Sequence, residues 1–105
     1  MGLTIDLPSA GLLGVSGATG GVITSNTNAV QNGIYIVEGT TSLTLTLPSS
    51  IDVGGTILVK NTGTGTITVT STADIENSAS DVTMNTQNEF IRFVYVSADY
   101  GYLKA

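Results

Sequence analysis

The sequence predicts an all-β fold, an antiparallel β-sandwich of jelly-roll type, and three observations support this prediction. Apolar and polar residues alternate strictly in short runs such as Ser42–Leu47, which places the leucines on one face and the hydroxyl groups on the other. Clusters of Gly, Asn, Asp and Pro separate these runs at spacings of about 10 residues. No stretch shows a helical pattern of useful length. Short strands punctuated in this way are typical of a sandwich or barrel.

Most of the expected strands follow one design, in which apolar residues point inward and threonine points outward. The expected strands are Ile34–Val37, Ser42–Leu47, Thr56–Lys60, Thr66–Thr70, Val82–Met84, Glu89–Val96 and Tyr100–Leu103. Pro48 ends the second of these runs, because proline cannot donate a hydrogen bond to a strand ladder. The loop Asn61–Gly65 contains two glycines and joins two alternating runs, which predicts a hairpin.

Residues 1–32 differ in character from residues 33–105, and this difference predicts two parts. From Gly11 to Gly20, glycine occupies every third position. Collagen needs many more triplets and is rich in proline, and a phosphate-binding loop needs a lysine that this run lacks. We therefore expect residues 1–32 to form an extended, glycine-rich N-terminal arm that lies close to another backbone. Residues 33–105 are expected to form the sandwich domain.

The composition argues against most kinds of enzyme. The chain has no His, Cys or Trp, which removes imidazole bases, thiol nucleophiles, disulfides and zinc sites with nitrogen or sulfur ligands. Only 10% of the residues are charged, the net charge is −5, and the three cations, Lys60, Arg92 and Lys104, are scattered. Nucleic acids and anionic membranes are bound through basic clusters, so neither is an expected partner. We expect no enzymatic activity and no cofactor.

One polar loop gathers the carboxylates that remain as candidates for chemistry. Asp74, Glu76 and Asp81 lie close together in the sequence, and a solvated loop is the simplest interpretation. Calcium prefers oxygen ligands supplied by a loop and is the alternative, although the spacing matches no loop pattern such as the EF-hand. Glycoside hydrolysis by paired carboxylates would need an apolar pocket that nothing near this loop supplies. We expect no metal site and no catalytic residue here.

Three tyrosines near the C-terminus form a candidate carbohydrate site, because exposed aromatic rings commonly stack on sugar faces. They are Tyr95, Tyr100 and Tyr102. Tyrosine is equally common as a half-buried anchor at the end of a strand, so a structural role is the competing interpretation.

Two expected strands are largely apolar on both faces and therefore need a second cover. These strands are Phe90–Val96 and Ile34–Val37. The cover is either the N-terminal segment of the same chain or another subunit, and the sequence leaves both possibilities open. The candidate interface residues are apolar residues of the arm and of one of these strands. They are Leu12, Leu13, Val15, Val22, Ile23, Phe90 and Val94.

The run from Gly33 to Val69 resembles a small β-domain of tailed-bacteriophage virion proteins, a group that includes tail fibres and capsid decoration (cement) proteins. The most specific part is Ser-Leu-Thr-Leu-Thr-Leu-Pro, followed by Val-Gly-Gly-Thr-Ile-Leu-Val-Lys-Asn. The likeness covers residues 33–103. Such domains often carry a Trp in the final strand, where this chain has Asp99–Tyr102, so a ligand role linked to that Trp does not carry over.

The resemblance implies a homotrimer that binds other virion proteins, and the low charge agrees, because few charges are present to block open sheet edges. We expect a capsid decoration protein on the outer surface of the phage head shell, made in the host cytoplasm. Its expected partner is the major capsid protein or another virion protein, reached by residues 3–25 of the arm. The alternative is a tail-fibre or head-fibre module that binds host surface carbohydrate. The chain begins at Met1 and is expected to be complete at 105 residues, which favours a decoration protein over a fibre.

Overall fold

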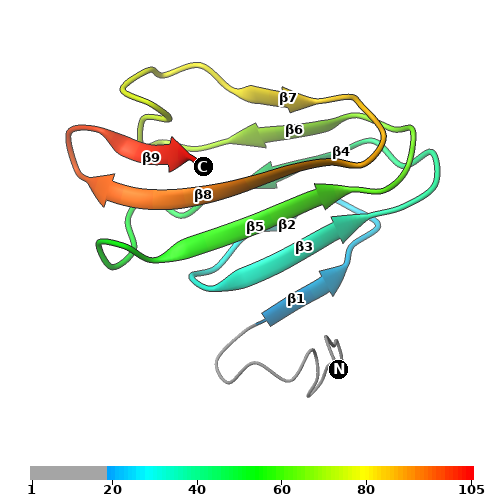
Figure 1. Cartoon of the computed structure of the whole chain (residues 1–105), viewed down its shortest axis with the longest axis horizontal. Helices are drawn as coiled ribbons and strands as arrows, with labels where there is room; N and C mark the ends of the chain where they lie inside the picture. Colours follow the sequence, from blue (N-terminus) through cyan, green and yellow to red (C-terminus); the bar gives the residue numbers. More distant parts are fainter. Residues whose placement is uncertain (1–18) are drawn as a thin grey trace.

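The computed structural model describes residues 19–105, which form nine β-strands and no helix (Figure 1). The strands are β1 Thr19–Val22, β2 Thr27–Asn28, β3 Gly33–Val37, β4 Leu43–Thr46, β5 Thr56–Asn61, β6 Ile67–Thr70, β7 Val82–Met84, β8 Glu89–Ser97 and β9 Gly101–Lys104. The all-β prediction is therefore confirmed for this part of the chain. Each expected strand is present, with ends displaced by a few residues at most.

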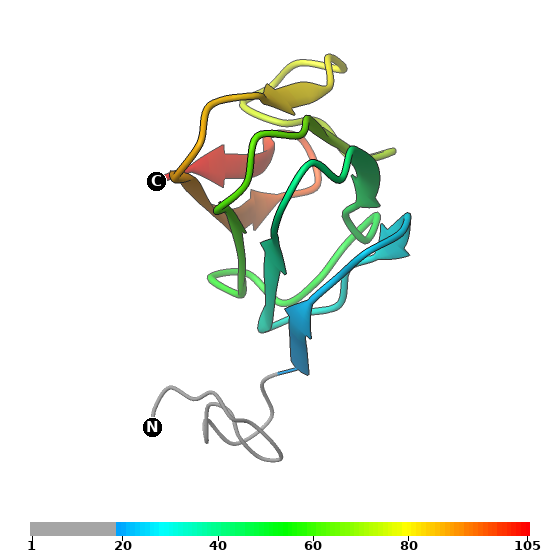
Figure 2. The same ribbon diagram turned by 90° about the vertical axis from the view of Figure 1, so that its right-hand side faces the viewer.

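The strands form two sheets that pack face to face, an arrangement compatible with a β-sandwich (Figures 1 and 2). One sheet has five strands in the order β1-β3-β5-β8-β9, and the other has four in the order β2-β4-β6-β7. Figure 2 is viewed along the strands and shows the chain passing back and forth between the two layers. Both sheets are mixed, with parallel and antiparallel neighbours.

From β1 to β6 the chain winds as a spiral, because successive strands alternate between the sheets and each pairs in parallel with the strand two places later. One coil of this spiral consists of two successive strands, one from each sheet. The coils β3-β4 and β5-β6 are in register at a spacing of 24 residues, as seen for Ile34 beside Leu58 and Leu43 beside Ile67. Stacking similar coils is the principle of repeat architectures, in which each unit covers the next.

The antiparallel jelly-roll prediction is wrong in its pairing. Four of the seven strand pairs are parallel, namely β1–β3, β3–β5, β2–β4 and β4–β6. Only β5–β8, β6–β7 and β8–β9 are antiparallel. A jelly roll is built from antiparallel Greek keys, so the spiral does not fit one. An alternating run of residues fixes which side chains point inward, but it carries no information about the direction of the neighbouring strand.

The predicted hairpin at Asn61–Gly65 is also wrong, because β5 and β6 lie in different sheets. The turn instead stacks on the equivalent turn of the preceding coil. The Thr62 and Thr64 amides donate to the carbonyls of Val37 at 2.8 Å and Gly39 at 2.7 Å. A Cβ at Gly65 would lie only 1.8 Å from the Thr41 carbonyl oxygen, so this close stacking requires glycine.

The described part of the predicted arm belongs to the two sheets. Residues 19–32 supply β1 and β2, which form one edge of each sheet and pair with β3 and β4. The boundary that we expected between residues 32 and 33 therefore falls inside the spiral. The remainder of the predicted arm, residues 1–18, lies outside the described residues.

The core lies between the sheets and contains the inward side chains that the alternation predicts. Leu45 is fully buried between outward Thr44 and Thr46, and the same pattern recurs along β3, β5 and β6. One polar side chain, Asn61, is also fully buried among the described residues. Its Nδ2 donates to the carbonyls of Gly65 and Met84, and its Oδ1 accepts from the Gly63 amide, so burial leaves no polar atom of this side chain unsatisfied.

Candidate functional site

The outward side of the five-stranded sheet is apolar and exposed, and we call it the apolar face. Its members alternate with core residues along β1, β3, β5, β8 and β9. They are Val22, Ile34, Ile36, Leu58, Phe90, Val94, Val96 and Leu103. Val22 and Phe90 are 54% and 50% exposed, although both belong to regular strands. A contiguous apolar patch on a protein surface commonly marks an interaction site.

The strand register places apolar residues of this face beside one another on neighbouring strands. Val22 pairs with Ile36 across β1 and β3, and Ile34 pairs with Leu58 across β3 and β5. At the other side of the sheet, Val94 pairs with Leu103 across β8 and β9. Because directly opposite side chains on one face of a sheet lie in contact distance, these pairs form one apolar area over β1, β3 and β5 and a second over β8 and β9. Between the two areas, each outward pair of β5 and β8 joins an apolar residue to Thr56, Lys60 or Arg92.

Two cations stand within the apolar face. Lys60 pairs with Phe90, and Arg92 pairs with Leu58, so the two charges occupy neighbouring diagonal positions on β5 and β8. No Asp or Glu projects from this face in the described strands. The salt bridge found within residues 19–105 joins Lys104 to Glu76 at 3.8 Å and involves neither Lys60 nor Arg92. The apolar face is therefore cationic in a chain of net charge −5.

The outward side of the four-stranded sheet is different, and we call it the threonine face. Thr44 pairs with Thr68, and Thr46 pairs with Thr70, across the parallel ladder of β4 and β6. Thr83 of β7 pairs with Thr68 and extends the row. These hydroxyl groups are able to hydrogen-bond with solvent and carry no charge. The sandwich thus has one outer face suited to solvent and one suited to protein contact.

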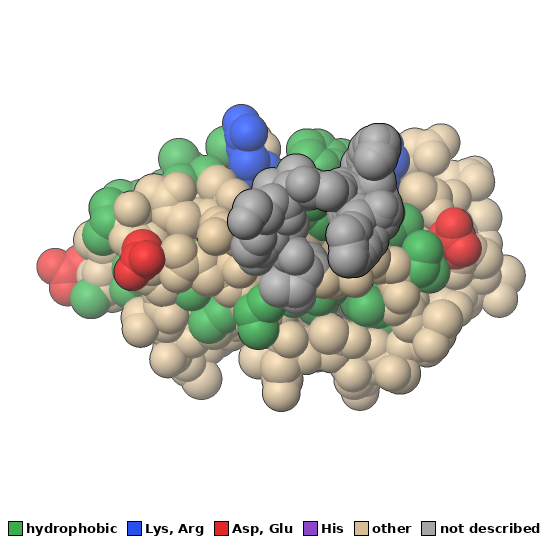
Figure 3. Space-filling view, turned by 90° about the horizontal axis from the view of Figure 1, so that it is seen from below, with side chains coloured by type: hydrophobic (Ala, Val, Ile, Leu, Met, Phe, Trp, Pro, Cys, Tyr) green, Lys and Arg blue, Asp and Glu red, His purple; other side chains and the backbone are tan. Residues whose placement is uncertain are grey.

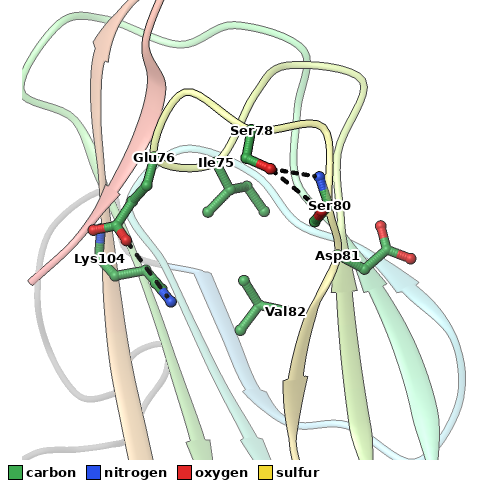
Figure 4. Close-up of a pocket in the computed structure, with 7 residues that line it drawn as sticks. All are labelled: Ile75, Glu76, Ser78, Ser80, Asp81, Val82 and Lys104. Carbon is green, nitrogen blue, oxygen red and sulfur yellow. Dashed lines mark hydrogen bonds and ion pairs between the residues drawn. The ribbon is translucent and has the colours of Figure 1, made fainter.

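A hollow of about 270 Å³ opens between the sheets beside the β6–β7 loop (Figure 4). Its lining comes from that loop, from the start of β7 and from β9, and consists of Ile75, Glu76, Ser78, Ser80, Asp81, Val82 and Lys104. The Ser78 hydroxyl accepts a hydrogen bond from the Ser80 amide at 3.3 Å. Part of the polar lining of the hollow is therefore already engaged in contacts within the loop. The Glu76 carboxylate is engaged by Lys104, which also donates its backbone amide at 3.3 Å.

The acidic loop does not assemble a ligand set for calcium. Asp74, Glu76 and Asp81 are close in sequence, but within residues 19–105 no group of three or more acidic side chains is placed to hold a metal ion. The Asp74 backbone carbonyl accepts from Tyr102, which ties this loop to β9. This arrangement gives the three carboxylates no shared chemistry.

The predicted carbohydrate platform is wrong for two of its three tyrosines. Tyr95 and Tyr102 lie in the core, 5% and 0% exposed, with ring centroids 5.3 Å apart in an edge-to-face contact. The Tyr102 hydroxyl donates to the Pro48 carbonyl at 2.8 Å, and burial raises the pKa of Tyr102 to about 12. Only Tyr100 is partly exposed. The residues near β9 that point outward are Leu103 and Val94 instead of tyrosines.

The candidate interface residues named from the sequence fall into three groups. Val22, Phe90 and Val94 lie on the apolar face. Ile23 is half-buried and packs against the core. Leu12, Leu13 and Val15 lie outside the described residues. The other residues of the apolar face are absent from the predicted set, because a run that is apolar on both sides does not by itself show which side lies outward. They are Ile34, Ile36, Leu58, Val96 and Leu103. The cross-strand pairing supplies that assignment.

Within residues 19–105, the structure has no helix that could cross a membrane. Comparison of the chain with protein-family models and with curated protein sequences yields no match.

Proposed function

We propose that this chain is a structural virion protein, a capsid decoration (cement) protein that binds the outer phage head shell as a trimer and stabilises it. The observation that carries the proposal is the apolar face, which lies opposite a threonine face of ordinary surface character. A regular sheet with solvent on its outer side normally carries polar residues there. The outward residues of β3 are instead both isoleucine, and β5 adds Leu58 beside Thr56 and Lys60, which favours coverage by protein in the working state.

Covering the apolar face in an assembly is energetically more favourable than leaving it exposed to water. Burying a whole Phe side chain contributes roughly 1.5–3 kcal/mol, so covering the half-exposed Phe90 contributes on the order of 1 kcal/mol. Several such side chains, together with those already half-buried on the same face, supply the stabilisation that a protein interface needs. Repeated binding at many subunit junctions around a shell would then raise the free energy required to separate them.

The choice of a decoration protein rests on the resemblance of residues 33–103 to domains of tailed-bacteriophage virion proteins. Homotrimers are usual among such domains. A closed ring of identical subunits would cover exposed apolar surface on every copy. In this proposal the major capsid protein or another virion protein is the second partner, and the N-terminal arm contributes to attachment. The working location is the capsid surface.

The alternative, a fibre module that recognises host carbohydrate, loses its main support in the tyrosine platform. Two of the three rings are core residues, and Tyr100 alone makes a weak stacking surface. The decoration proposal does not depend on these rings. The apolar face on which it rests is unaffected by their burial.

The test combines oligomeric state with binding to expanded head shells that lack this protein. We expect the purified chain to be a trimer by light scattering and to co-sediment with the shells. Phe90→Asp places a carboxylate on the apolar face and should abolish both properties. Thr68→Asp makes the matched change on the threonine face and should leave both intact, with circular dichroism confirming that each variant is folded. A wild-type monomer that does not bind shells would contradict the proposal.

A further inference from the structure

One end of the sandwich presents exposed apolar side chains beside a carboxylate, and we call this group the end knob. It consists of Val30 from the β2–β3 loop and Asp52 and Val53 from the β4–β5 loop, which lie together at the left in Figure 1. Val53 is 75% exposed and Val30 is 45% exposed, so neither side chain contributes much to the core. These two valines are separate from the apolar face and form a second exposed apolar group at one end of the molecule.

The end knob is held in place by hydrogen bonds. The Gln31 side chain brackets Asp52, with Nε2 donating to Oδ2 at 3.1 Å and Oε1 accepting from the Asp52 amide at 3.2 Å. The loop is also tied to β8, because the Gly54 amide donates to the Tyr95 carbonyl at 2.8 Å and the Tyr95 amide donates to Gly55 at 3.0 Å. A surface element fixed in this way loses little conformational freedom on binding.

The end knob and the apolar face are complementary in chemistry. The apolar face carries two cations, Lys60 and Arg92, and no carboxylate, whereas the end knob carries a carboxylate, Asp52, between apolar side chains and no cation. Figure 3 shows the side of β1, with basic side chains along one border and acidic ones toward both ends of the long axis. Opposite potentials of this kind set partner choice and register.

We propose that the apolar face of one copy receives the end knob of a second copy, so that Val53 packs on the sheet and Asp52 faces Lys60 and Arg92. The two surfaces lie on different parts of the molecule, so the contact is heterologous and repeats around a ring. This inference rests on the proposed homotrimer and specifies the surfaces that build it.

Two other ways of pairing copies fit the structure less well. Packing two apolar faces together would bring Lys60 and Arg92 of both copies into one interface without a carboxylate, and unpaired buried charges are strongly unfavourable. Pairing sheet edges is poorly supported, because β2 and β7 are only two and three residues long. The β9 edge is already occupied by the β6–β7 loop, since the Tyr102 amide donates to the Asp74 carbonyl and the Glu76 amide donates to the Tyr102 carbonyl. The β1 edge contains Gly20 and Gly21 with φ of 113° and 115°, which are not ordinary strand geometry.

Cysteine crosslinking tests the contact directly, because the chain has no cysteine of its own. The full-length double variant Val53→Cys/Leu58→Cys should form covalent oligomers up to a closed ring under mild oxidation. Each single variant, treated in the same way, should remain uncrosslinked. Disulfide formation by Leu58→Cys alone would show that apolar faces meet one another, and formation by Val53→Cys alone would show that end knobs meet. Either result would overturn the proposal.

A charge reversal gives the second test and does not depend on cysteine geometry. Asp52→Lys and Arg92→Asp should each weaken trimer formation by about tenfold or more, and the double variant should recover most of the lost affinity. Glu38→Lys makes the corresponding change at the opposite end of the sandwich and should leave the trimer intact. Weakening by both single changes without recovery in the double variant would contradict the pairing.

The outcomes separate this inference from the proposed function. A wild-type trimer that binds shells but shows neither the crosslink nor the charge recovery would overturn the head-to-face contact alone. A wild-type monomer that fails to bind shells would overturn both proposals. A monomer in which Phe90 is nevertheless protected from hydroxyl-radical labelling would show that residues 1–18 of the same chain cover the face, which would also overturn the contact.

Discussion

The two outer faces of this sandwich are built largely by the same spiral yet differ in the chemistry of their outward side chains. Strands β3 and β5 carry isoleucine and leucine outward, whereas the next strand of each coil, β4 or β6, carries threonine outward. The inward residues of all four strands are equally buried. Strand formation and core packing therefore place no demand on the outward residues. We propose that their identity reflects what each face meets, which is protein on one side and water on the other.

The largest effect on stability is expected in the core between the two sheets. Leu45 is fully buried, and Leu45→Ala should lower the free energy of unfolding by about 2–5 kcal/mol, because the cavity cannot collapse. Urea denaturation followed by circular dichroism measures this change. Thr44→Ala, the outward neighbour on the threonine face, is the control and should cost less than about 1 kcal/mol. Similar losses for both variants would contradict the assigned orientation of β4.

A second effect is expected at the turns that stack one coil on the next. Gly65→Ala would force a Cβ against the Thr41 carbonyl oxygen and should cost about 1–3 kcal/mol of unfolding free energy. Thr64→Ala lies beside it in the same turn with an exposed side chain and should be nearly neutral. Thermal unfolding compares the two. A neutral Gly65→Ala would mean that the coils do not stack at this spacing.

Exchanging the character of the faces should change assembly more than stability. Leu58→Thr/Phe90→Thr gives the apolar face the composition of the threonine face and should yield a folded monomer, because each side chain is partly exposed. The reciprocal variant Thr44→Ile/Thr68→Ile should remain folded and gain non-native self-association. Light scattering across a concentration series measures both. If Leu58→Thr/Phe90→Thr still formed the wild-type oligomer, the proposed difference in role between the two faces would be contradicted.

The smallest effect is expected from Tyr102 at alkaline pH. Its pKa is raised from 10.0 to about 12 in the folded protein, mainly by burial, so the folded state favours the neutral hydroxyl. The corresponding stability is fully present below pH 10 and is lost as the pH rises toward 12. Tyr102→Phe should flatten the fall in unfolding free energy across this window while losing the hydrogen bond to Pro48.

Much of the local structure is predictable from the sequence, because alternation acts within each strand. The inward positions of Leu43, Leu45, Ile67 and Val69 follow from their spacing alone. Strand direction is not predictable in this way, because an alternating strand pairs equally well in either sense. A further signal is nevertheless present. Leu-Thr-Leu-Thr at 43–46 recurs as Ile-Thr-Val-Thr at 67–70, and Gly39 recurs as Gly63, each 24 residues later. Internal repetition at a fixed spacing is typical of coiled repeat folds.

The candidate site is predictable only in part, for a related reason. Phe90 and Val94 were recognised because their strand is apolar on both sides, which requires a second cover. Tyr95 was misassigned because the same strand gives no indication of which side faces the core. The cationic character of the face emerges only from pairing, since Lys60 and Arg92 are distant in sequence and become neighbours when β5 joins β8. Long-range pairing, not local pattern, decides such features.

The central claim is that assembly covers the apolar face and leaves the threonine face in water. The most direct measurement is the rate of maleimide modification of Leu103→Cys and Thr83→Cys, each in assembled and in dissociated protein. Both side chains are exposed in the isolated subunit, and they lie on opposite outer faces. We expect assembly to protect Leu103→Cys strongly and to leave the rate at Thr83→Cys unchanged. Equal rates at Leu103→Cys in both states, or protection confined to Thr83→Cys, would contradict it.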